Sequence, residues 1–119
     1  MSDLKDIIER NNLKIDNFSL SEDYGTENFC FLLYSLIKMQ KPKNVLELGC
    51  GYGCVSTIIG QALKENKKGK LWCIDDQSDW PHIKEVLKKI KEDYNTYDEY
   101  INFLINKFEL NDYIEYKNI

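Results

Sequence analysis

The 119-residue chain is long enough for one domain, and its 43% hydrophobic content is sufficient for a buried core. A formal net charge of −4 argues against non-specific nucleic-acid binding, which needs a surplus of positive charge. The sequence contains no secretory signal and no apolar run near the ~20 residues that a membrane-spanning helix needs. We therefore expect a cytoplasmic protein with no membrane partner.

The four cysteines, Cys30, Cys50, Cys54 and Cys73, lie in or beside predicted core elements and form no C-x-x-C pair. We expect them to be reduced thiols, as is typical of a cytosolic protein. His82 is the only histidine, which excludes a histidine-rich metal site. The sequence thus predicts no metal site.

The first 40 residues are predicted to contain two helices. Ser2 is a candidate cap for a helix over residues 3–11, whereas residues 13–23 show no regular pattern. Thr26 is a candidate cap for a second helix, which Pro42 closes. Five apolar residues share one face of that helix: Phe29, Leu32, Leu33, Leu36 and Ile37.

The segment 44–76 is predicted to form a strand, a glycine-rich turn, a helix and a second strand. Val45–Leu48 and Leu71–Ile74 are short apolar runs, as is typical of buried parallel strands. Between them, apolar residues recur at the spacing of one helical face. Asp75 follows the second run. Since ligands of open α/β sheets bind outside the carboxyl ends of the strands, we expect the functional site here.

The turn has an acid followed by three alternating glycines, Glu47-x-Gly49-x-Gly51-x-Gly53. Glycines let the backbone turn sharply and approach a ligand closely. The amino end of the next helix favours a carboxylate or phosphate, and an acid after the second strand can accept hydrogen bonds from ribose hydroxyls. A dinucleotide fingerprint would need a glycine where Cys54 stands, which disfavours an NAD-dependent oxidoreductase.

This pattern resembles the first motif of class I S-adenosylmethionine-dependent methyltransferases, and CIDDQ resembles their second motif. The resemblance covers residues 24–119, and VLELGCGYG is its most specific part. It implies a Rossmann-like methyltransferase fold, with three α/β/α layers around a parallel sheet, and S-adenosylmethionine as cofactor. The helices within residues 1–40 would then cover the cofactor site.

The resemblance assigns Glu47 to the amino-acid end of the cofactor and the three glycines to its methionine tail. Asp75 would bind the ribose, while Asp76 and Gln77 would contact the adenine edge. The candidate cofactor-binding residues are Glu47, Gly49, Cys50, Gly51, Tyr52, Gly53, Asp75, Asp76 and Gln77. The sequence identifies no catalytic residue.

Residues 77–119 predict two more helices and a third strand. Pro81 suits the first position of one helix, and Thr96 opens the next. Tyr113–Lys117 has the alternation of a strand. Trp80, before the first of these helices, could stack on adenine or anchor this segment to the core. The methyltransferase-like sheet is thus expected to be truncated after its third strand, in the order 3-2-1.

Two function classes remain open for the single, partial domain formed by residues 1–119. One is S-adenosylmethionine-dependent methyl transfer to a small-molecule oxygen acceptor. The other is a truncated methyltransferase-like protein that binds a nucleoside, S-adenosylmethionine or a partner chain without catalysis. In a truncated sheet Val45–Leu48 would be an exposed edge, which proteins usually cover or pair. We therefore expect a homo-oligomer, or a partner chain that supplies the missing half of the sheet.

Overall fold

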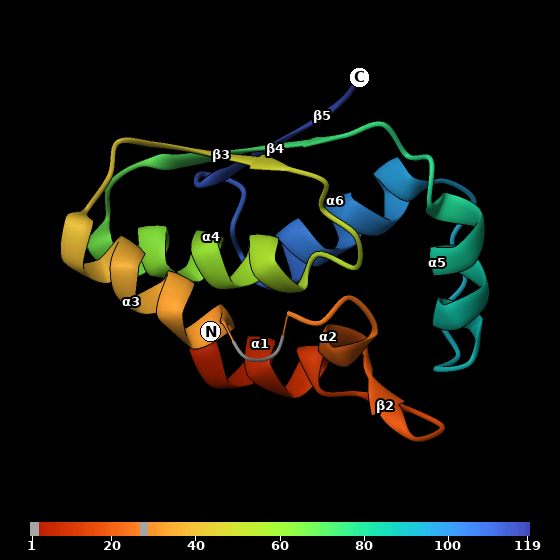
Figure 1. The fold of residues 1–119 in the computed structure, drawn as a ribbon. Helices are drawn as coiled ribbons and strands as arrows, with labels where there is room; N and C mark the ends of the chain where they lie inside the picture. Colours follow the sequence, from red (N-terminus) through yellow and green to blue (C-terminus); the bar gives the residue numbers. More distant parts are fainter. Residues whose placement is uncertain (1–2, 27–28) are drawn as a thin grey trace.

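A computed structural model of the chain describes residues 3–26 and 29–119. Figure 1 shows how the helices and strands are arranged. In chain order they are α1 (Leu4–Asn11), β1 (Lys14–Ile15), β2 (Phe18–Ser19), α2 (Leu20–Asp23), α3 (Cys30–Gln40), β3 (Asn44–Leu48), α4 (Cys54–Asn66), β4 (Lys70–Asp75), α5 (Trp80–Lys88), α6 (Tyr97–Lys107) and β5 (Ile114–Asn118).

The three longer strands form one parallel sheet with β4 at its centre. Val45 of β3 lies opposite Leu71 of β4, and Leu71 lies opposite Ile114 of β5. Helices connect these strands, because a parallel pair needs a crossover that returns the chain to the same end of the sheet. The mixed α/β class is confirmed, and each parallel strand begins and ends within one residue of its predicted bounds.

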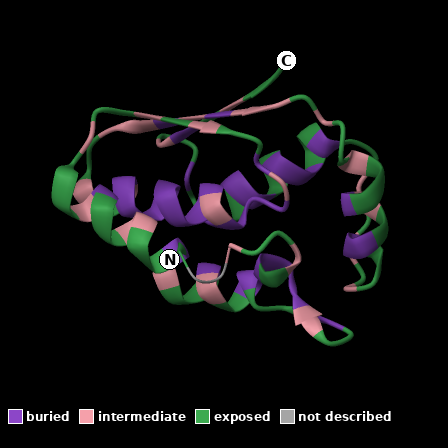
Figure 2. Cartoon of the chain, viewed as in Figure 1, coloured by how far each residue is buried: buried purple, intermediate pink, exposed green. Residues whose placement is uncertain are grey.

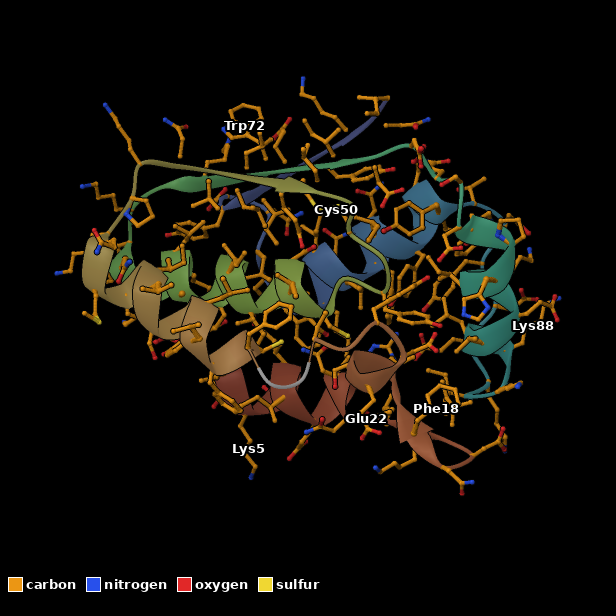
Figure 3. All side chains as sticks on the ribbon, viewed as in Figure 1. Lys5, Phe18, Glu22, Cys50, Trp72 and Lys88 are labelled. Atoms are coloured by element: carbon orange, nitrogen blue, oxygen red, sulfur yellow. A yellow bond between two sulfur atoms is a disulfide. The ribbon has the colours of Figure 1, made fainter. Side chains whose placement is uncertain are left out.

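All described helices lie on one side of the parallel sheet, so none of them covers its other face (Figure 1). On the other side Leu46 and Leu48 are 61% and 74% exposed, and Trp72 projects away from the helices (Figure 3). The three-layer arrangement expected from the sequence is therefore wrong for the described residues. The apolar side chains on both faces of β3 suggested cover on both sides, but these helices cover only one.

The segment 13–23 has more regular structure than predicted. β1 and β2 form an antiparallel pair in which Lys14 lies opposite Ser19, and α2 follows directly. Strands of two residues are too short to give a recognisable alternation, which is why the sequence did not reveal them. This additional two-stranded sheet makes the strand order of the whole chain differ from the expected one.

Two helix starts also differ from the predictions. The side chain of Asp3 accepts a hydrogen bond from the N–H of Asp6 and caps α1. The predicted cap, Ser2, lies outside the described residues. The next long helix, α3, begins at Cys30, later than the Thr26 cap implied. The Thr26 hydroxyl instead donates to the carbonyl oxygen of Ser21 at 3.0 Å.

The helix α4 lies between the sheet and the helices α1 and α3, and Figure 2 shows that it is buried along most of its length. Gly60 permits close packing there, because a Cβ at this position would lie 2.6 Å from Cδ1 of Ile114 on β5. Tyr97 and Tyr100 of α6 complete the core with exposures of 1% and 0%. None of the described helices has the length and apolar character needed to cross a membrane.

Candidate functional site

A cavity of about 510 Å³ lies at the carboxyl ends of β3 and β4, where the sequence predicts a ligand site. This volume is within the usual range for small-molecule sites. The lining residues come from α2 and the segment after it, the ends of both strands, the glycine turn, the start of α4, the segment between β4 and α5, and the final residue: Leu20, Tyr24, Thr26, Glu47, Leu48, Gly49, Cys50, Gly51, Tyr52, Cys54, Val55, Ile74, Asp75, Asp76, Ser78, Asp79 and Ile119.

The carboxylate of Asp75 holds the turns after both strands. One of its oxygens accepts the N–H of Cys50 at 2.7 Å, and the other accepts the N–H of Gln77 at 2.6 Å. The N–H of Gly49 donates to the carbonyl of Ile74 at 2.7 Å, so the pairing of β3 and β4 continues into the turn. Asp75 therefore shapes the cavity wall as well as offering lone pairs to a ligand.

The three glycines of the turn have different surroundings, although all adopt positive φ angles. A Cβ on Gly49 would have no atom within 4 Å, so this residue faces open space in the cavity wall. A Cβ on Gly51 would lie 3.1 Å from the ring of Tyr24. One on Gly53 would lie 2.7 Å from Cδ1 of Leu104 in the core. Only Gly49 thus leaves space that a ligand can use directly.

The amino end of α4 lies at the cavity. Gly53 is the N-cap residue, with φ of 80°, and it provides no side-chain cap. Cys54 and Val55 in the first turn line the cavity. The N–H groups at a helix start carry partial positive charge and suit a carboxylate or phosphate.

Glu47 lies in β3, two residues before Gly49, and its side chain points toward α4. Its Oε1 accepts a hydrogen bond from the Ser56 hydroxyl at 2.5 Å. Burial raises the pKa of Glu47 to about 7, against the lowering effect of the Ser56 hydrogen bond, and the negative charge of Asp75 adds to the rise. Glu47 is therefore a carboxylate whose charge is poorly stabilised in the free protein.

The cavity wall is acidic. Four carboxylates line it, from Glu47, Asp75, Asp76 and Asp79, and no lysine, arginine or histidine is among the lining residues of the described chain. Within the same described ranges, neither Glu47 nor Asp75 takes part in an ion pair. This electrostatic environment favours a ligand that carries positive charge.

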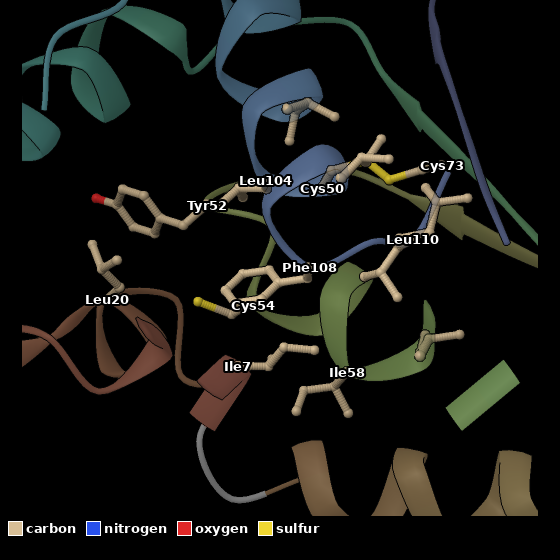
Figure 4. Close-up of a cluster of buried hydrophobic side chains, with 14 of the residues drawn as sticks. Ile7, Leu20, Cys50, Tyr52, Cys54, Ile58, Cys73, Leu104, Phe108 and Leu110 are labelled. Carbon is tan, nitrogen blue, oxygen red and sulfur yellow. A yellow bond between two sulfur atoms is a disulfide. The ribbon is translucent and has the colours of Figure 1, made fainter. Parts of the chain in front are cut away.

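Cys50 of the glycine turn and Cys73 of β4 form a disulfide (Figure 4). Their Cα atoms are 6.4 Å apart, because β4 runs beside the turn that follows β3. The prediction that all four cysteines are reduced thiols is therefore wrong for this pair. A separation of 23 residues gives no sequence signal of pairing. Cys30 and Cys54 are buried and take no part in this disulfide.

The same region brings together three side chains with metal-binding donor types. One carboxylate oxygen of Glu47 and the sulfur atoms of Cys50 and Cys73 all lie within 4.8 Å of one another. The residues are 3 and 23 positions apart along the chain, a spacing without a recognisable motif. The expectation of no metal site was based on histidine content, which gives no information about a cluster of one carboxylate and two sulfur atoms.

Tyr52, a predicted site residue, contacts polar side chains at the rim of the cavity that were not among the predicted site residues. The Tyr52 hydroxyl donates to Oδ2 of Asp23 at 2.5 Å, and Nε2 of His82 lies 3.0 Å from the same oxygen. The hydroxyl of Tyr24, whose ring lies 5.0 Å from that of Tyr52, donates to Asp79. These contacts connect α2 and the glycine turn to the start of α5. They join residues 29 to 59 positions apart, so no local pattern predicts them.

Seven of the nine predicted site residues line the cavity, whereas Gly53 and Gln77 do not. Gly53 is packed against the core, and the side-chain amide of Gln77 donates to Tyr116 at 2.8 Å. Trp80 is not a lining residue either. Its ring packs against Tyr97 with centroids 5.7 Å apart, which matches the anchoring role and not the stacking role.

Tyr97 is a further residue that the sequence did not assign to the site. Its hydroxyl donates to the carbonyl oxygen of Gly51 at 2.6 Å and holds the turn from the α6 side. Its position on the apolar face of a predicted helix indicated a core residue. It is indeed 1% exposed, but its hydroxyl also fixes the turn.

Comparison of the chain with protein-family models, with curated proteins and with solved structures finds no match.

The pKa of Glu47 predicts a pH-dependent gain in stability for the Glu47→Gln variant. Between pH 4.5 and about 7 the folded protein retains a proton that the unfolded chain releases, so stability falls as pH rises. Glutamine keeps an acceptor for Ser56 but cannot ionise. We expect the free energy of unfolding of the variant, relative to the parent, to increase by roughly 3 kcal/mol from pH 4.5 to 8. Urea unfolding of both proteins measures this difference.

Glu65→Gln, also on α4, is the matched control. Burial raises the pKa of Glu65, but hydrogen bonds from Tyr34, Gln61 and Lys38 lower it below its usual value. The relative stability of this variant should therefore change in the opposite direction. If the difference in the free energy of unfolding between Glu47→Gln and the parent does not vary with pH, the Glu47 carboxylate is solvated and the account of its burial is wrong.

Proposed function

We propose that this chain binds S-adenosylmethionine in the cavity at the carboxyl ends of β3 and β4 and transfers its methyl group. The observation that carries the proposal is the acidic wall beside the glycine turn, without basic side chains among its described lining residues. S-adenosylmethionine has a positive sulfonium and a positive ammonium group, which would offset the charges of Glu47 and Asp75.

Each part of the cofactor has a suitable partner in the cavity. The ammonium group would lie near Glu47, and the carboxylate near the free N–H groups at the start of α4. The ribose hydroxyls would donate to Asp75, whose oxygens each retain a lone pair beyond the backbone hydrogen bonds that they accept. Leu48, Ile74 and Ile119 provide apolar surface for the adenine.

The alternative of a dinucleotide is less compatible with this cavity. A pyrophosphate would introduce negative charge beside four carboxylates, with no lysine or arginine among the described lining residues to compensate. The Cys54 position also lacks the glycine that a dinucleotide fingerprint requires. Both arguments favour a mononucleoside with a cationic tail.

The proposed reaction is attack of an acceptor oxygen on the sulfonium methyl group. Positioning the two groups in line and excluding water accelerate such a transfer, so few catalytic side chains are needed. The rim carries oxygen and nitrogen groups that a hydroxyl of a small-molecule acceptor can contact, from Tyr24, Asp79 and the Asp23–His82 pair. The second candidate function, cofactor binding without turnover, is favoured by the small sheet, because only two of the described strands, β3 and β4, contribute their ends to the cavity.

Selective binding and the role of Gly49 test the proposal together. Calorimetric titration should show binding of S-adenosylmethionine and S-adenosylhomocysteine, and weaker or no binding of NAD.

Gly49→Ala places a methyl group in the open space of the cavity wall. We expect it to weaken S-adenosylhomocysteine binding by about tenfold or more, equivalent to about 1.4 kcal/mol. Formation of S-adenosylhomocysteine with hydroxylated acceptors would then separate turnover from binding alone.

Gly25→Ala is the matched control. Gly25 has φ of 67°, a Cβ there would also have no atom within 4 Å, and the residue does not line the cavity. Both variants therefore introduce similar backbone strain. Equal loss of affinity in the two variants would attribute the effect to strain, and tighter binding of NAD would contradict the proposal.

We further propose that a second copy of the chain associates at β3. The carbonyl oxygen of Lys43 and the N–H of Gly49 form hydrogen bonds with β4. Because the backbone groups of successive strand residues point to alternate sides, the N–H and C=O groups of Asn44, Leu46 and Leu48 face the open edge. Two β3 strands paired antiparallel about Leu46 would place Leu46 opposite its counterpart, and Asn44 opposite Leu48. This pairing would provide hydrogen-bond partners for the backbone groups of the open edge and bring the two exposed apolar surfaces together.

Light scattering at micromolar concentration should therefore detect a dimer of the parent chain. Leu46→Lys should shift it toward monomer, because a charged side chain on an edge strand opposes pairing. Met39→Lys is the control, since Met39 is 75% exposed and belongs to α3 and not to the edge strand β3. A monodisperse monomer for the parent chain, or equal effects of both substitutions, would contradict association through β3.

A further inference from the structure

We infer that Glu47, Cys50 and Cys73 form a binding site for a thiophilic divalent metal ion of the zinc class when the two cysteines are reduced. The three donors come from β3, the glycine turn and β4, and they lie within 4.8 Å of one another. Sγ of Cys73 is 3.2 Å from Oε1 of Glu47. An ion placed among them would thus contact three protein ligands without a change in the strand pairing.

The donor types select the metal. Two thiolates and one carboxylate suit zinc and the spectroscopic substitutes cobalt and cadmium, whereas magnesium and calcium prefer oxygen ligands only. Zinc sites with three protein ligands leave a fourth position for water or another ligand. Glu47 and Cys50 line the cavity, so this fourth position would open into it.

The residues around the three donors shield them from solvent and can orient them. Cys50 and Cys73 are 5% and 0% exposed, which protects the sulfur ligands from bulk water. The Ser56 hydroxyl lies 2.5 Å from Oε1 of Glu47 and 3.3 Å from Sγ of Cys73, where it can orient both ligands. A divalent ion would also offset the charges of Glu47 and Asp75, which have no ion-pair partner within residues 3–26 and 29–119.

Metal binding and the disulfide exclude one another. A disulfide sulfur has no proton to release and is not a thiolate ligand. Opening the bond takes two electrons and two protons and gives two thiols. A phosphine reductant supplies the electrons and is oxidised, with water, to the phosphine oxide. The ion then displaces the two thiol protons, forming two metal–sulfur bonds. Oxidation state therefore controls the site.

Cobalt titration of the phosphine-reduced chain, without any nucleoside, tests the inference. We expect one ion per chain, with thiolate-to-cobalt charge-transfer absorption and the visible bands of tetrahedral cobalt, both of which zinc should abolish by displacement. The oxidised parent chain should show neither signal. This comparison needs no substitution, so it does not depend on whether a variant folds.

Substitutions then assign the ligands. Cys50→Ser and Cys73→Ser each remove one of the two sulfur ligands, so each should reduce the thiolate-to-cobalt charge-transfer absorption. Ser56→Ala should weaken cobalt binding by about tenfold, as for other residues that orient ligands. Cys54→Ser, which changes a buried cysteine outside the cluster, should leave the titration unchanged. Absence of stoichiometric cobalt binding by the reduced parent, or an equal signal from Cys73→Ser, would overturn the inference. Either result would leave the nucleoside titrations unaffected.

Discussion

The hydrogen bonds from the backbone to Asp75 are the constraint on which the proposed site depends. Parallel pairing of β3 and β4 brings their carboxyl ends together, and the Asp75 carboxylate then accepts N–H groups from the turn after each strand. This fixes the glycine turn beside an acid and leaves Gly49 facing open space. Tyr97 holds the same turn from α6 through the carbonyl of Gly51.

The position of this turn also determines which charged groups share the cavity. Glu47 precedes the turn and Asp75 lies beside it, so both carboxylates line the cavity, and no basic side chain is among its described lining residues. Burial of Glu47 and the charge of Asp75 raise the pKa of Glu47. A cationic ligand, whether a sulfonium nucleoside or a metal ion held by Glu47 and the cysteines, would relieve this repulsion.

The sheet around the site is asymmetric. Leu71 and Ile114 are buried against the helices, whereas Leu46 and Leu48 lie on the opposite face and remain exposed. The described residues thus place a helical layer on only one side of the sheet. The exposed apolar face and the open edge of β3 occur in the same strand that carries Glu47, so any association through β3 would lie close to the cavity.

The sequence predicted the strand–turn–helix–strand unit well because its signals are local. Short apolar runs gave the parallel strands, and the acid with alternating glycines gave the position of the cavity. Contacts between distant residues were not predictable in this way. The Cys50–Cys73 disulfide, the Tyr52–Asp23 hydrogen bond and the hydroxyl of Tyr97 all depend on how the elements pack.

Some sequence patterns are compatible with more than one structural role. Gly53 belongs to the glycine motif assigned to the cofactor, and the absence of its Cβ also allows Leu104 to pack against the turn, since a Cβ there would lie 2.7 Å from Cδ1 of Leu104. Apolar residues on both faces of β3 indicated a strand buried on both sides, although exposed leucines give the same pattern as buried ones. Periodicity alone reports the chemical character of a face and does not report whether another element covers it.

Amide chemical-shift mapping during a titration with S-adenosylmethionine tests the central claim most directly, because it locates the bound ligand. The account predicts saturable shifts for the amides of Cys50, Gly51, Val55 and Asp76, all of which line the cavity. It would be contradicted if these amides did not respond at saturation, or if the largest shifts occurred at Leu46 and Trp72 on the opposite face of the sheet.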